Sequence, residues 1–404
     1  MADTPKIRFK GYTDAWEQRK LSDLIIEYKE TVDSDCTLPV LTSSKTEGVV
    51  LQEEHFGRVQ NHDITGYNIL PRNYCTYRNR SDGVDFTFNI NRCCDKGIIS
   101  KFYPVFYGNN SDIFFISMVL NYCDEVVHEI AYTCTGTGQK VLSFLDLQKM
   151  NIRVPSYDEQ KKISQYFEQL DNLITLHQRK CDETKTLKKY MLQKMFPKNG
   201  ATKPEIRFSG FTDDWEQRKF GDDIESIQTG TNLLGSESKN GTPLLKMGNI
   251  QRGYFDISKV EYLDESDTVE PENIAYYGDF FFNTRNTMEL VGKGATWLGD
   301  SGKYAFNSNI ARFKFKDIDT VFFNYLYNTE DMKKQIHARA TGTTSVAAIY
   351  PRALETVEYY VPSREEQSKI GTLFIYIDNL ITLHQRKCDE LKELKKYMLQ
   401  NMFV

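Results

Sequence analysis

Two arginine–asparagine pairs are the residues of this chain best suited to recognising nucleic acid. Arg78 and Asn79, followed by Arg80, come directly after an aromatic run, and Arg285 and Asn286 follow another such run 207 residues after the first pair. In the major groove of DNA, arginine donates two hydrogen bonds to guanine and asparagine pairs in a similar way with adenine. The pairs therefore predict contact with bases or phosphates. A solvated turn, or an arginine that bridges a local carboxylate, is the plainer alternative.

Glycine and small hydroxyl residues dominate two loops, 135–140 and 341–345, that each lead towards the last predicted strand before a long helix. Such residues allow backbone amides to approach a phosphate closely. We expect these loops to contact DNA, with a plain turn as the alternative. The predicted contact residues are Thr135, Gly136, Thr137, Lys140, Thr341, Gly342, Thr343, Thr344 and Ser345.

A third polar group follows a short apolar stretch opened by proline, at Pro39 and again at Pro243. Its amide, hydroxyl and basic side chains are of the kinds that contact bases and the DNA backbone. The residues predicted to contact DNA here are Ser43, Ser44, Lys45, Lys246, Asn249, Gln251 and Arg252.

Motifs for catalysis are not recognisable in the chain. It contains no phosphate-binding P-loop, no GxGxxG and no HExxH, and its six histidines are scattered. The acidic pairs Glu53-Glu54 and Asp222-Asp223 lack a neighbouring lysine in a strand context that would indicate a nuclease. We therefore predict no catalytic residues and no metal site, which favours an adaptor or targeting protein.

The elements that must position these residues come from an internal duplication. Residues 5–21 return as 204–220, and residues 154–197 return as 361–404, with DNLITLHQRKCDE identical in both copies. The segments between the repeated blocks have diverged. The duplication therefore predicts one fold present twice, with each copy carrying a different surface.

The second repeated block predicts a long helix in each copy. Ser156-x-x-Glu159 and Ser363-x-x-Glu366 are capping boxes, and the apolar residues that follow repeat in alternating steps of four and three. At about 1.5 Å per residue each helix is roughly 60 Å long, too long for one domain to cover, so we expect the two helices to pack on each other with the variable domains at opposite ends. The predicted packing residues are Ile163, Phe167, Leu170, Ile174, Ile370, Phe374, Ile377 and Ile381.

The predicted fold class is α+β, with two mixed α/β domains separated by two long helices packed as an antiparallel coiled coil, and with a pseudo-twofold internal repeat. The boundaries are 1–153 for the first domain, 154–197 for the first helix, 198–360 for a linker (198–203) and the second domain, and 361–404 for the second helix. Trp16 and Trp215 recur in the repeated openings and are predicted to be packing anchors. The pairs Lys188-Lys189 and Lys395-Lys396 are suited to contact with phosphate or with an acidic protein surface, and a solvated helix face is the alternative.

Composition narrows the class of protein further. The 404 residues include 40% hydrophobic and 26% charged side chains, which is typical of a globular protein, and no apolar window or leader predicts a membrane span or secretion. Eight cysteines without a CxxC pair predict reduced thiols in the cytoplasm and no structural zinc. The net charge of −5 means that a DNA-binding surface must be local, so we expect the isolated chain to bind DNA weakly.

The chain resembles the DNA-specificity subunits of type I restriction-modification enzymes. The resemblance covers essentially the whole chain and rests on the IRF and WEQRK segments of each opening, on LLKMGNIQRG (244–253) and GDFFFNTRN (278–286), and on the VPS entry and heptad block of each helix. It implies two target-recognition domains that read a split double-stranded DNA site. Because the two domains differ in sequence, the two half-sites should differ as well.

The resemblance also implies partners and a bacterial cytoplasmic location. Proteins of this family dock two methyltransferase subunits, which modify adenine N6, and recruit motor-endonuclease subunits. S-adenosylmethionine, ATP and Mg²⁺ would be used by those partners, so this chain would bind no cofactor and be no enzyme on its own. One alternative is a non-catalytic protein–protein adaptor with two variable binding domains. A second alternative is a self-contained methyltransferase or nuclease, which the absence of catalytic motifs disfavours.

Overall fold

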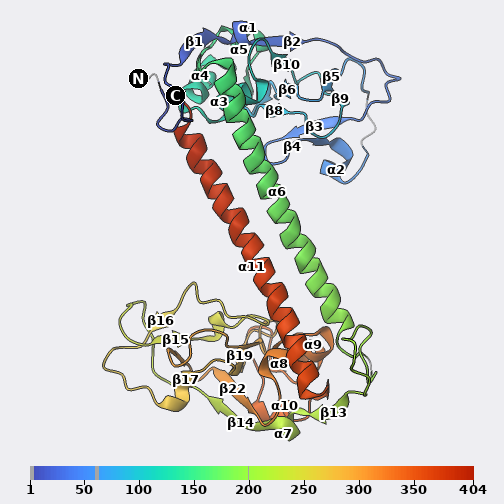
Figure 1. Cartoon of the computed structure of the whole chain (residues 1–404), viewed down its shortest axis with the longest axis vertical. Coiled ribbons are helices and arrows are strands. Elements are labelled where there is room, and N and C mark those ends of the chain that lie inside the picture. The colour runs from blue at the N-terminus through green and yellow to red at the C-terminus, as the bar shows by residue number, and fades with distance from the viewer. Residues whose placement is uncertain (1–3, 60–62, 199) are drawn as a thin grey trace. The chain divides into compact units, whose positions relative to one another are not determined.

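The computed structural model describes residues 4–59, 63–198 and 200–404. Asn199, within the predicted linker, lies outside the described residues. The chain divides into two compact units, which we call unit 1 (residues up to 178 together with 386–404) and unit 2 (residues 179–385). Each unit contains one variable domain and a part of both long helices, α6 (Tyr157–Lys194) and α11 (Arg364–Asn401). Figure 1 shows α6 in green and α11 in red.

The variable domain of unit 1 has a four-stranded sheet in the order β2-β10-β6-β8, with two-stranded sheets β1-β12, β3-β4, β5-β9 and β7-β11 around it. Its elements are β1 (Glu17–Lys20), α1 (Leu21–Leu24), β2 (Ile25–Tyr28), β3 (Leu41–Ser44), β4 (Gly48–Leu51), α2 (Gln52–Phe56), β5 (Asn68–Pro71), β6 (Cys75–Thr76), β7 (Arg80–Ser81), β8 (Asn89–Ile90), β9 (Lys96–Ile99), β10 (Val105–Gly108), α3 (Ile113–Tyr122), α4 (Asp124–Thr133), β11 (Lys140–Val141), α5 (Phe144–Lys149) and β12 (Asn151–Val154).

The variable domain of unit 2 repeats this topology with the sheet β14-β22-β18-β20, and adds the sheet β16-β15-β21-β17. Its elements are β13 (Glu216–Lys219), α7 (Phe220–Asp223), β14 (Ile224–Thr229), β15 (Pro243–Leu245), η1 (Met247–Asn249), β16 (Glu261–Tyr262), η2 (Pro271–Asn273), β17 (Ile274–Ala275), β18 (Phe280–Asn283), β19 (Arg285–Asn286), β20 (Gly294–Thr296), β21 (Tyr304–Phe306), β22 (Ile310–Phe315), α8 (Thr320–Tyr327), α9 (Glu330–His337), β23 (Thr341–Gly342), β24 (Ala347–Ala348), α10 (Pro351–Leu354) and β25 (Glu358–Val361). The predicted fold class and internal repeat are confirmed.

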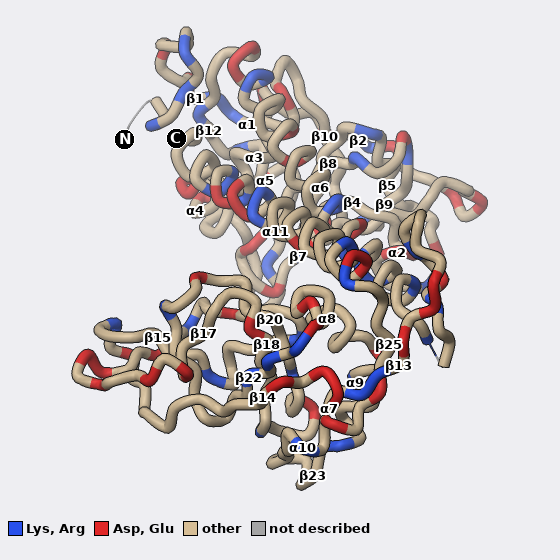
Figure 2. The backbone as a smooth tube through the Cα atoms, turned by 60° about the horizontal axis from the view of Figure 1, so that its bottom comes forward, with Lys and Arg blue, Asp and Glu red and all other residues tan. Residues whose placement is uncertain are grey.

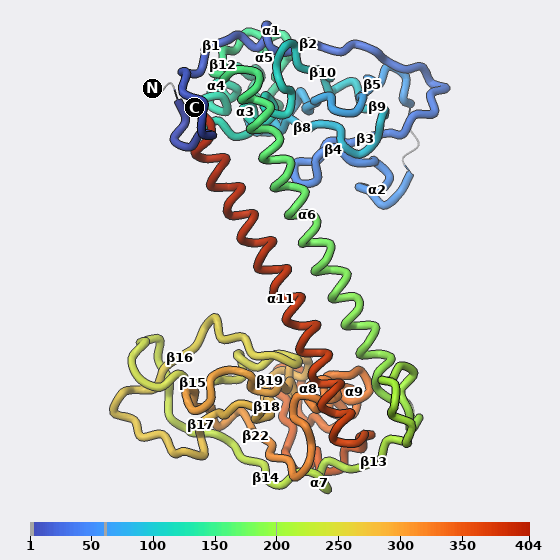
Figure 3. The backbone as a smooth tube through the Cα atoms, in the orientation of Figure 1, coloured from blue at the N-terminus to red at the C-terminus, as the bar shows by residue number. Residues whose placement is uncertain are grey.

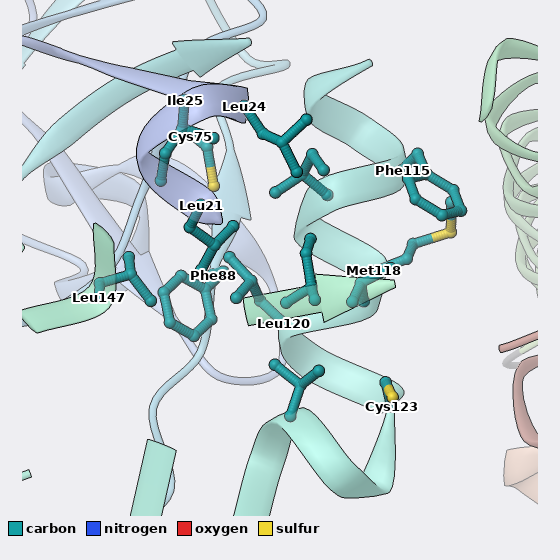
Figure 4. Close-up of a cluster of buried hydrophobic side chains, with 14 of the residues drawn as sticks. Leu21, Leu24, Ile25, Cys75, Phe88, Phe115, Met118, Leu120, Cys123 and Leu147 are labelled. Carbon is teal, nitrogen blue, oxygen red and sulfur yellow. The ribbon is translucent and has the colours of Figure 1, made fainter. Parts of the chain in front are cut away.

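Each unit has its own apolar core between the sheet and a pair of short helices. In unit 1, Leu21 and Leu24 lie on one side of α3, and Phe115 of α3 projects from the opposite side of that helix (Figure 4). The core of unit 2 is rich in aromatic rings, with centroids of Phe280 and Phe323 4.8 Å apart. Most of the chain's phenylalanines are therefore buried in the apolar clusters of the two units or packed against them.

The two repeated tryptophans are packing anchors, as predicted. Trp16 is 4% exposed and its ring lies 5.6 Å from that of Phe115. Trp215 is 2% exposed and lies 5.8 Å from Phe322. Both therefore fix the repeated opening of their copy against the short helix behind the sheet.

Each long helix begins at the predicted capping serine. The backbone amides of Glu159 and Glu366 donate to the hydroxyls of Ser156 and Ser363 at 3.4 Å. The structure adds a contact that the capping pattern did not predict. Both carboxylate oxygens of Glu159 accept hydrogen bonds from Arg8, at 2.6 and 2.7 Å.

The second copy repeats this buried ion pair. Both carboxylate oxygens of Glu366 accept from Arg207 at 2.7 Å, and Glu159 and Glu366 are each fully buried. The recurrence of Arg8 as Arg207 and of Glu159 as Glu366 thus has a physical cause: the arginine of each opening neutralises a carboxylate at the buried start of the following helix.

The predicted packing stripe of the long helices contacts the domain cores as well as the opposite long helix. Ile163, Phe167 and Leu170 join the core of unit 1, where Met402 from the end of α11 packs with them. Ile370, Phe374 and Ile377 join the core of unit 2 together with Met195 from the end of α6. Ile174 and Ile381 lie further along the helices and are half-buried. The first part of each stripe is therefore covered both by its own domain and by the end of the opposite long helix.

Pairing of α6 with α11 is antiparallel in both units. In unit 1 Lys395 is 2.6 Å from Asp171 and the Cys388 thiol lies 3.5 Å from the Gln178 amide oxygen. In unit 2 Lys188 is 2.6 Å from Asp378, at the equivalent positions of the repeat. One lysine of each Lys-Lys pair therefore bridges the two helices.

The repeated openings also meet the ends of the long helices. In unit 1 the amide of Ile7 donates to the carbonyl of Asn401 at 3.0 Å, and the described residues near the N-terminus lie beside the C-terminal end of α11 (Figure 3). In unit 2 the amide of Ile206 donates to the carbonyl of Lys194 at 2.9 Å. The last residues of the second copy thus complete unit 1, just as the last residues of the first copy complete unit 2.

No helix among the described residues is long and apolar enough to span a membrane. All eight cysteines are free thiols, and no cluster of side chains within the described ranges has the composition of a metal site.

Candidate nucleic-acid interface

Two of the predicted groups in unit 1 form a single two-stranded sheet. Strand β7 pairs antiparallel with β11, so that Ser81 lies opposite Lys140 and Arg80 opposite Val141. The backbone of Thr135 exchanges two hydrogen bonds of 2.9 Å with Val141. The Arg78–Arg80 segment and the 135–140 loop, with its exposed Thr135, Gly136 and Thr137, are therefore neighbours.

The third predicted group of unit 1 contacts β8 of the four-stranded sheet and the loop after β7, and it shares a hollow with Arg78 and Arg80. The amide of Asn89 donates to the Ser43 hydroxyl at 2.8 Å and to the Ser44 carbonyl at 2.9 Å, and Lys45 forms an ion pair with Asp85. A hollow of about 290 Å³ is lined by Ser43, Lys45, Arg78, Arg80, Ser81, Asp82, Gly83, Asp85, Phe86, Thr87 and Tyr103. The structure thus brings the three groups of unit 1 together.

Unit 2 repeats this arrangement in a three-stranded sheet, β19-β24-β23. Arg285 lies opposite Ala348, which in turn lies opposite Thr341, and Asn286 and Gly342 are both opposite Ala347. The turn that follows, with Thr343, Thr344 and Ser345, is exposed.

Arg252, Gln251 and Lys246, three further predicted contact residues of unit 2, each interact with a different part of the domain. The Arg252 guanidinium donates to the Glu289 carbonyl at 3.2 Å, and the Gln251 side chain accepts from Lys293 at 2.7 Å. Lys246 pairs with Glu261 at 2.7 Å.

Asn249 faces inward rather than towards solvent. It is 6% exposed, its side-chain oxygen accepts from the Lys246 amide at 2.9 Å, and its side-chain nitrogen donates to the carbonyls of Asp256 and Lys259 at 2.9 and 2.8 Å. These bonds use the hydrogen-bonding groups by which an asparagine would read adenine, so its observed role is to shape the loop.

Backbone pairing corrects the register that the sequence suggested for the arginines. Arg80 lies opposite Val141 and Arg285 lies opposite Ala348, while the amides of the residues after these partners, Leu142 and Ile349, donate to the carbonyls of Asn79 and Thr284. Arg80, not Arg78, is therefore the structural counterpart of Arg285. The RN dipeptides misled the alignment because identical letters recur two residues out of register.

Sequence reasoning missed the segment at the middle of each site, which we call the central loop: residues 82–88 in unit 1 and 287–293 in unit 2. Each central loop joins the strand that carries the arginine to the last strand of the four-stranded sheet. In unit 1 Asp85 pairs with Lys45, and the Asp82 carboxylate lies 3.5 Å from the Gln139 amide. In unit 2 the Met288 amide donates to the Thr344 carbonyl at 3.1 Å.

A signal for the central loops was present in the sequence. Both are seven residues long and begin two residues after the aligned arginine, yet they read DGVDFTF and TMELVGK. Equal length with different chemistry is the pattern expected of a segment that discriminates between ligands.

Local electrostatics differ between the two sites. Hydrogen bonding from Lys45 lowers the pKa of the Asp85 carboxyl. Burial, and then the nearby charge of Arg252, lower the pKa of the Lys293 ammonium. Figure 2 shows basic and acidic residues interspersed along both units. Positive potential, which attracts the DNA backbone, is therefore local and does not extend over a whole unit.

Comparison with known proteins agrees with this architecture. A solved structure described as the S subunit of a type I restriction-modification system from M. genitalium superposes with a TM-score of 0.59, covers 99% of both chains and is 12% identical. The type I restriction enzyme MjaVIII specificity subunit of Methanocaldococcus jannaschii is 27% identical over 273 residues, or 65% of this chain. The chain matches 64% of the length of that relative.

A family match decides the assignment. Residues 95–186 and 212–393 match the family of the type I restriction modification DNA specificity domain. The matched ranges include the candidate interface of unit 2, the 135–140 loop of unit 1 and most of both long helices. The chain therefore belongs to the type I restriction modification DNA specificity family.

Proposed function

We propose that this chain is the DNA-specificity subunit of a type I restriction-modification complex and that it reads a split, asymmetric site in double-stranded DNA. The observation that carries the proposal is a convergence of separate polar segments in each unit: the glycine–threonine loop lies beside the strand of Arg80 or Arg285, and the third polar segment contacts the central loop that follows this strand. Convergence of basic and hydroxyl side chains from distant segments is what a DNA-reading surface requires.

Each unit offers groups for both kinds of DNA contact. The exposed arginines Arg78, Arg80, Arg252 and Arg285 suit phosphates or guanine, and the glycine–threonine loops suit phosphates. The central loops differ in sequence, so the two half-sites differ and the full site is not a palindrome. We leave Asn249 out of the contact surface because its side chain is used inside the loop.

We further propose that two methyltransferase subunits dock on the helical part of the chain and that motor-endonuclease subunits join them. The identical block in both helices supports this, because two copies of one surface suit two copies of one partner. Adenine-N6 methylation and ATP-dependent cleavage, with S-adenosylmethionine, ATP and Mg²⁺, are assigned to those partners, in the bacterial cytoplasm.

The test is single-molecule mapping of methylated adenines in cells that carry this gene and its methyltransferase partner, compared with cells that lack only this gene. We expect a split, asymmetric motif that disappears with the gene. An active methyltransferase with an unchanged methylation pattern would overturn the proposal and favour a protein–protein adaptor. A version carrying Arg80→Ala and Arg285→Ala should lose the motif while the chain remains folded.

A further inference from the structure

We infer that Lys293, in the central loop of unit 2, reads a guanine in the half-site of that unit and that Gln251 positions it. The inference rests on the proposed function, because it names the base contact within the same DNA site. It goes beyond that function by assigning base identity to one side chain that neither the sequence motifs nor the family match single out.

The first argument is the unbalanced charge around Lys293. Its ammonium group donates to the neutral Gln251 oxygen at 2.7 Å. Burial, and after it the charge of Arg252, lower the pKa of Lys293, and the nearby charge of Glu289 opposes them only in part. Throughout the described ranges, Lys293, Arg252 and Arg285 form no salt bridge within 4.0 Å, whereas the nearby Lys246 pairs with Glu261 at 2.7 Å. Partial burial of a cation beside another cation is unfavourable unless a ligand supplies negative potential.

The second argument is that Lys293 is held in place. The Asn283 amide donates to the Lys293 carbonyl at 2.8 Å, which ties the end of the central loop to strand β18 two residues before Arg285. Gln251 is itself fixed, because its side-chain nitrogen donates to the Gly248 carbonyl at 2.8 Å. A half-buried lysine with a fixed ammonium group is suited to one position on a base edge, whereas phosphate contacts tolerate mobile, exposed side chains.

The third argument compares the two copies. The residue directly before the last sheet strand is Lys293 in unit 2 and Phe88 in unit 1, and Phe88 is 2% exposed within the core. A phosphate contact is independent of sequence and is useful in both units. A cation present in only one of them is expected where that unit alone selects a particular base. Guanine, with its O6 and N7 acceptors, is the base that lysine recognises in the major groove.

The experiment uses the full chain assembled with its methyltransferase partner and duplex oligonucleotides that carry the mapped motif. Each position of the unit 2 half-site is changed singly, the other half-site is kept constant, and relative affinity is measured by competition. We expect the native complex to prefer guanine at one position by about 10- to 100-fold. In Lys293→Gln that preference should fall below about 3-fold while every other position keeps its preference, because only one base contact has been removed.

Two further variants separate reading from folding. Gln251→Glu places a carboxylate against the Lys293 ammonium and should weaken the guanine preference at the same position without removing the lysine. Lys303→Gln is the control, since Lys303 pairs with Asp300 at 3.1 Å outside the interface, and it should leave all preferences unchanged.

The alternative outcomes are distinct. If Lys293→Gln lowers affinity equally for all sequences and reduces the salt dependence by about one phosphate contact, Lys293 binds the backbone and the inference is wrong. If Lys293→Gln and Gln251→Glu both leave all base preferences unchanged, Lys293 is a solvated side chain that contacts no base, and the inference is wrong. If the native complex shows no preference at any position, the proposed function itself fails.

Discussion

Arg80 and Arg285 occupy the same position in the two copies of the fold, each on a short strand opposite the residue that also pairs with the glycine–threonine loop. Their equivalence places one exposed guanidinium at the centre of each candidate interface. Arg78, which the sequence had aligned with Arg285, corresponds instead to a buried asparagine of β18, Asn283.

Alanine substitution should reveal this equivalence. We expect Arg80→Ala and Arg285→Ala to weaken binding of the assembled complex to its DNA by similar amounts, about 1–3 kcal/mol each if the arginine contacts a base. Arg78→Ala should have a smaller effect. Competition binding at fixed salt measures all three, and a larger loss for Arg78→Ala than for Arg80→Ala would contradict the structural register.

The buried ion pairs at the helix starts should be sensitive to loss of one partner. Glu159→Gln leaves the Arg8 guanidinium without its counter-charge at a site where the glutamate is fully buried, and we expect a loss of about 3 kcal/mol in unfolding free energy. Glu366→Gln should do the same in unit 2. Glu183→Gln is the control, because its pair with Arg179 is exposed on both sides and should contribute less than about 0.5 kcal/mol. Urea unfolding measures the three variants, and equal losses would refute the argument.

Residues at the end of each long helix should stabilise the domain of the opposite copy. Met402 is 1% exposed in the core of unit 1, so Met402→Ala should cost about 2–4 kcal/mol and reduce amide exchange protection in α3. Met195→Ala should act in the same way on α8 of unit 2. Leu394→Ala, at a position 40% exposed, is the matched control and should have little effect. Protection lost from α8 rather than α3 in Met402→Ala would contradict the assignment.

Alkaline pH should destabilise unit 2 through Tyr359. Burial raises the pKa of this phenol, and its hydrogen bond to Asp223 raises it further. The folded state therefore keeps the phenol neutral at pH values where the same phenol ionises in the unfolded chain, in which its pKa is about 10. The contribution of Tyr359 is complete below that pH and declines as the pH rises above it.

Tyr359→Phe tests this linkage. Without the ionisable group, the unfolding free energy should fall less steeply between about pH 9.5 and 11.5 than in the native chain. Urea unfolding across that range measures both slopes, and parallel slopes would show that Tyr359 does not carry the effect.

By itself, the sequence determined the duplication, the two long helices, the tryptophan anchors and the three polar segments of each copy. These features follow from local rules: repeated letters, heptad spacing, capping residues and side-chain chemistry act over a few residues at a time. The family resemblance rested on the same patterns and was confirmed.

Only the tertiary structure decided which of these segments meet. The pairing of Arg80 with Val141 joins positions far apart in the chain, and its register depends on backbone hydrogen bonds that identical RN letters cannot reveal. Likewise, the capping pattern at Glu159 could not show that the carboxylate is neutralised by Arg8, because that contact forms only when the opening packs against the helix start. The central loops became part of the site for the same reason: sequence fixes their composition, whereas the closing of the sheet places Lys293 beside Gln251.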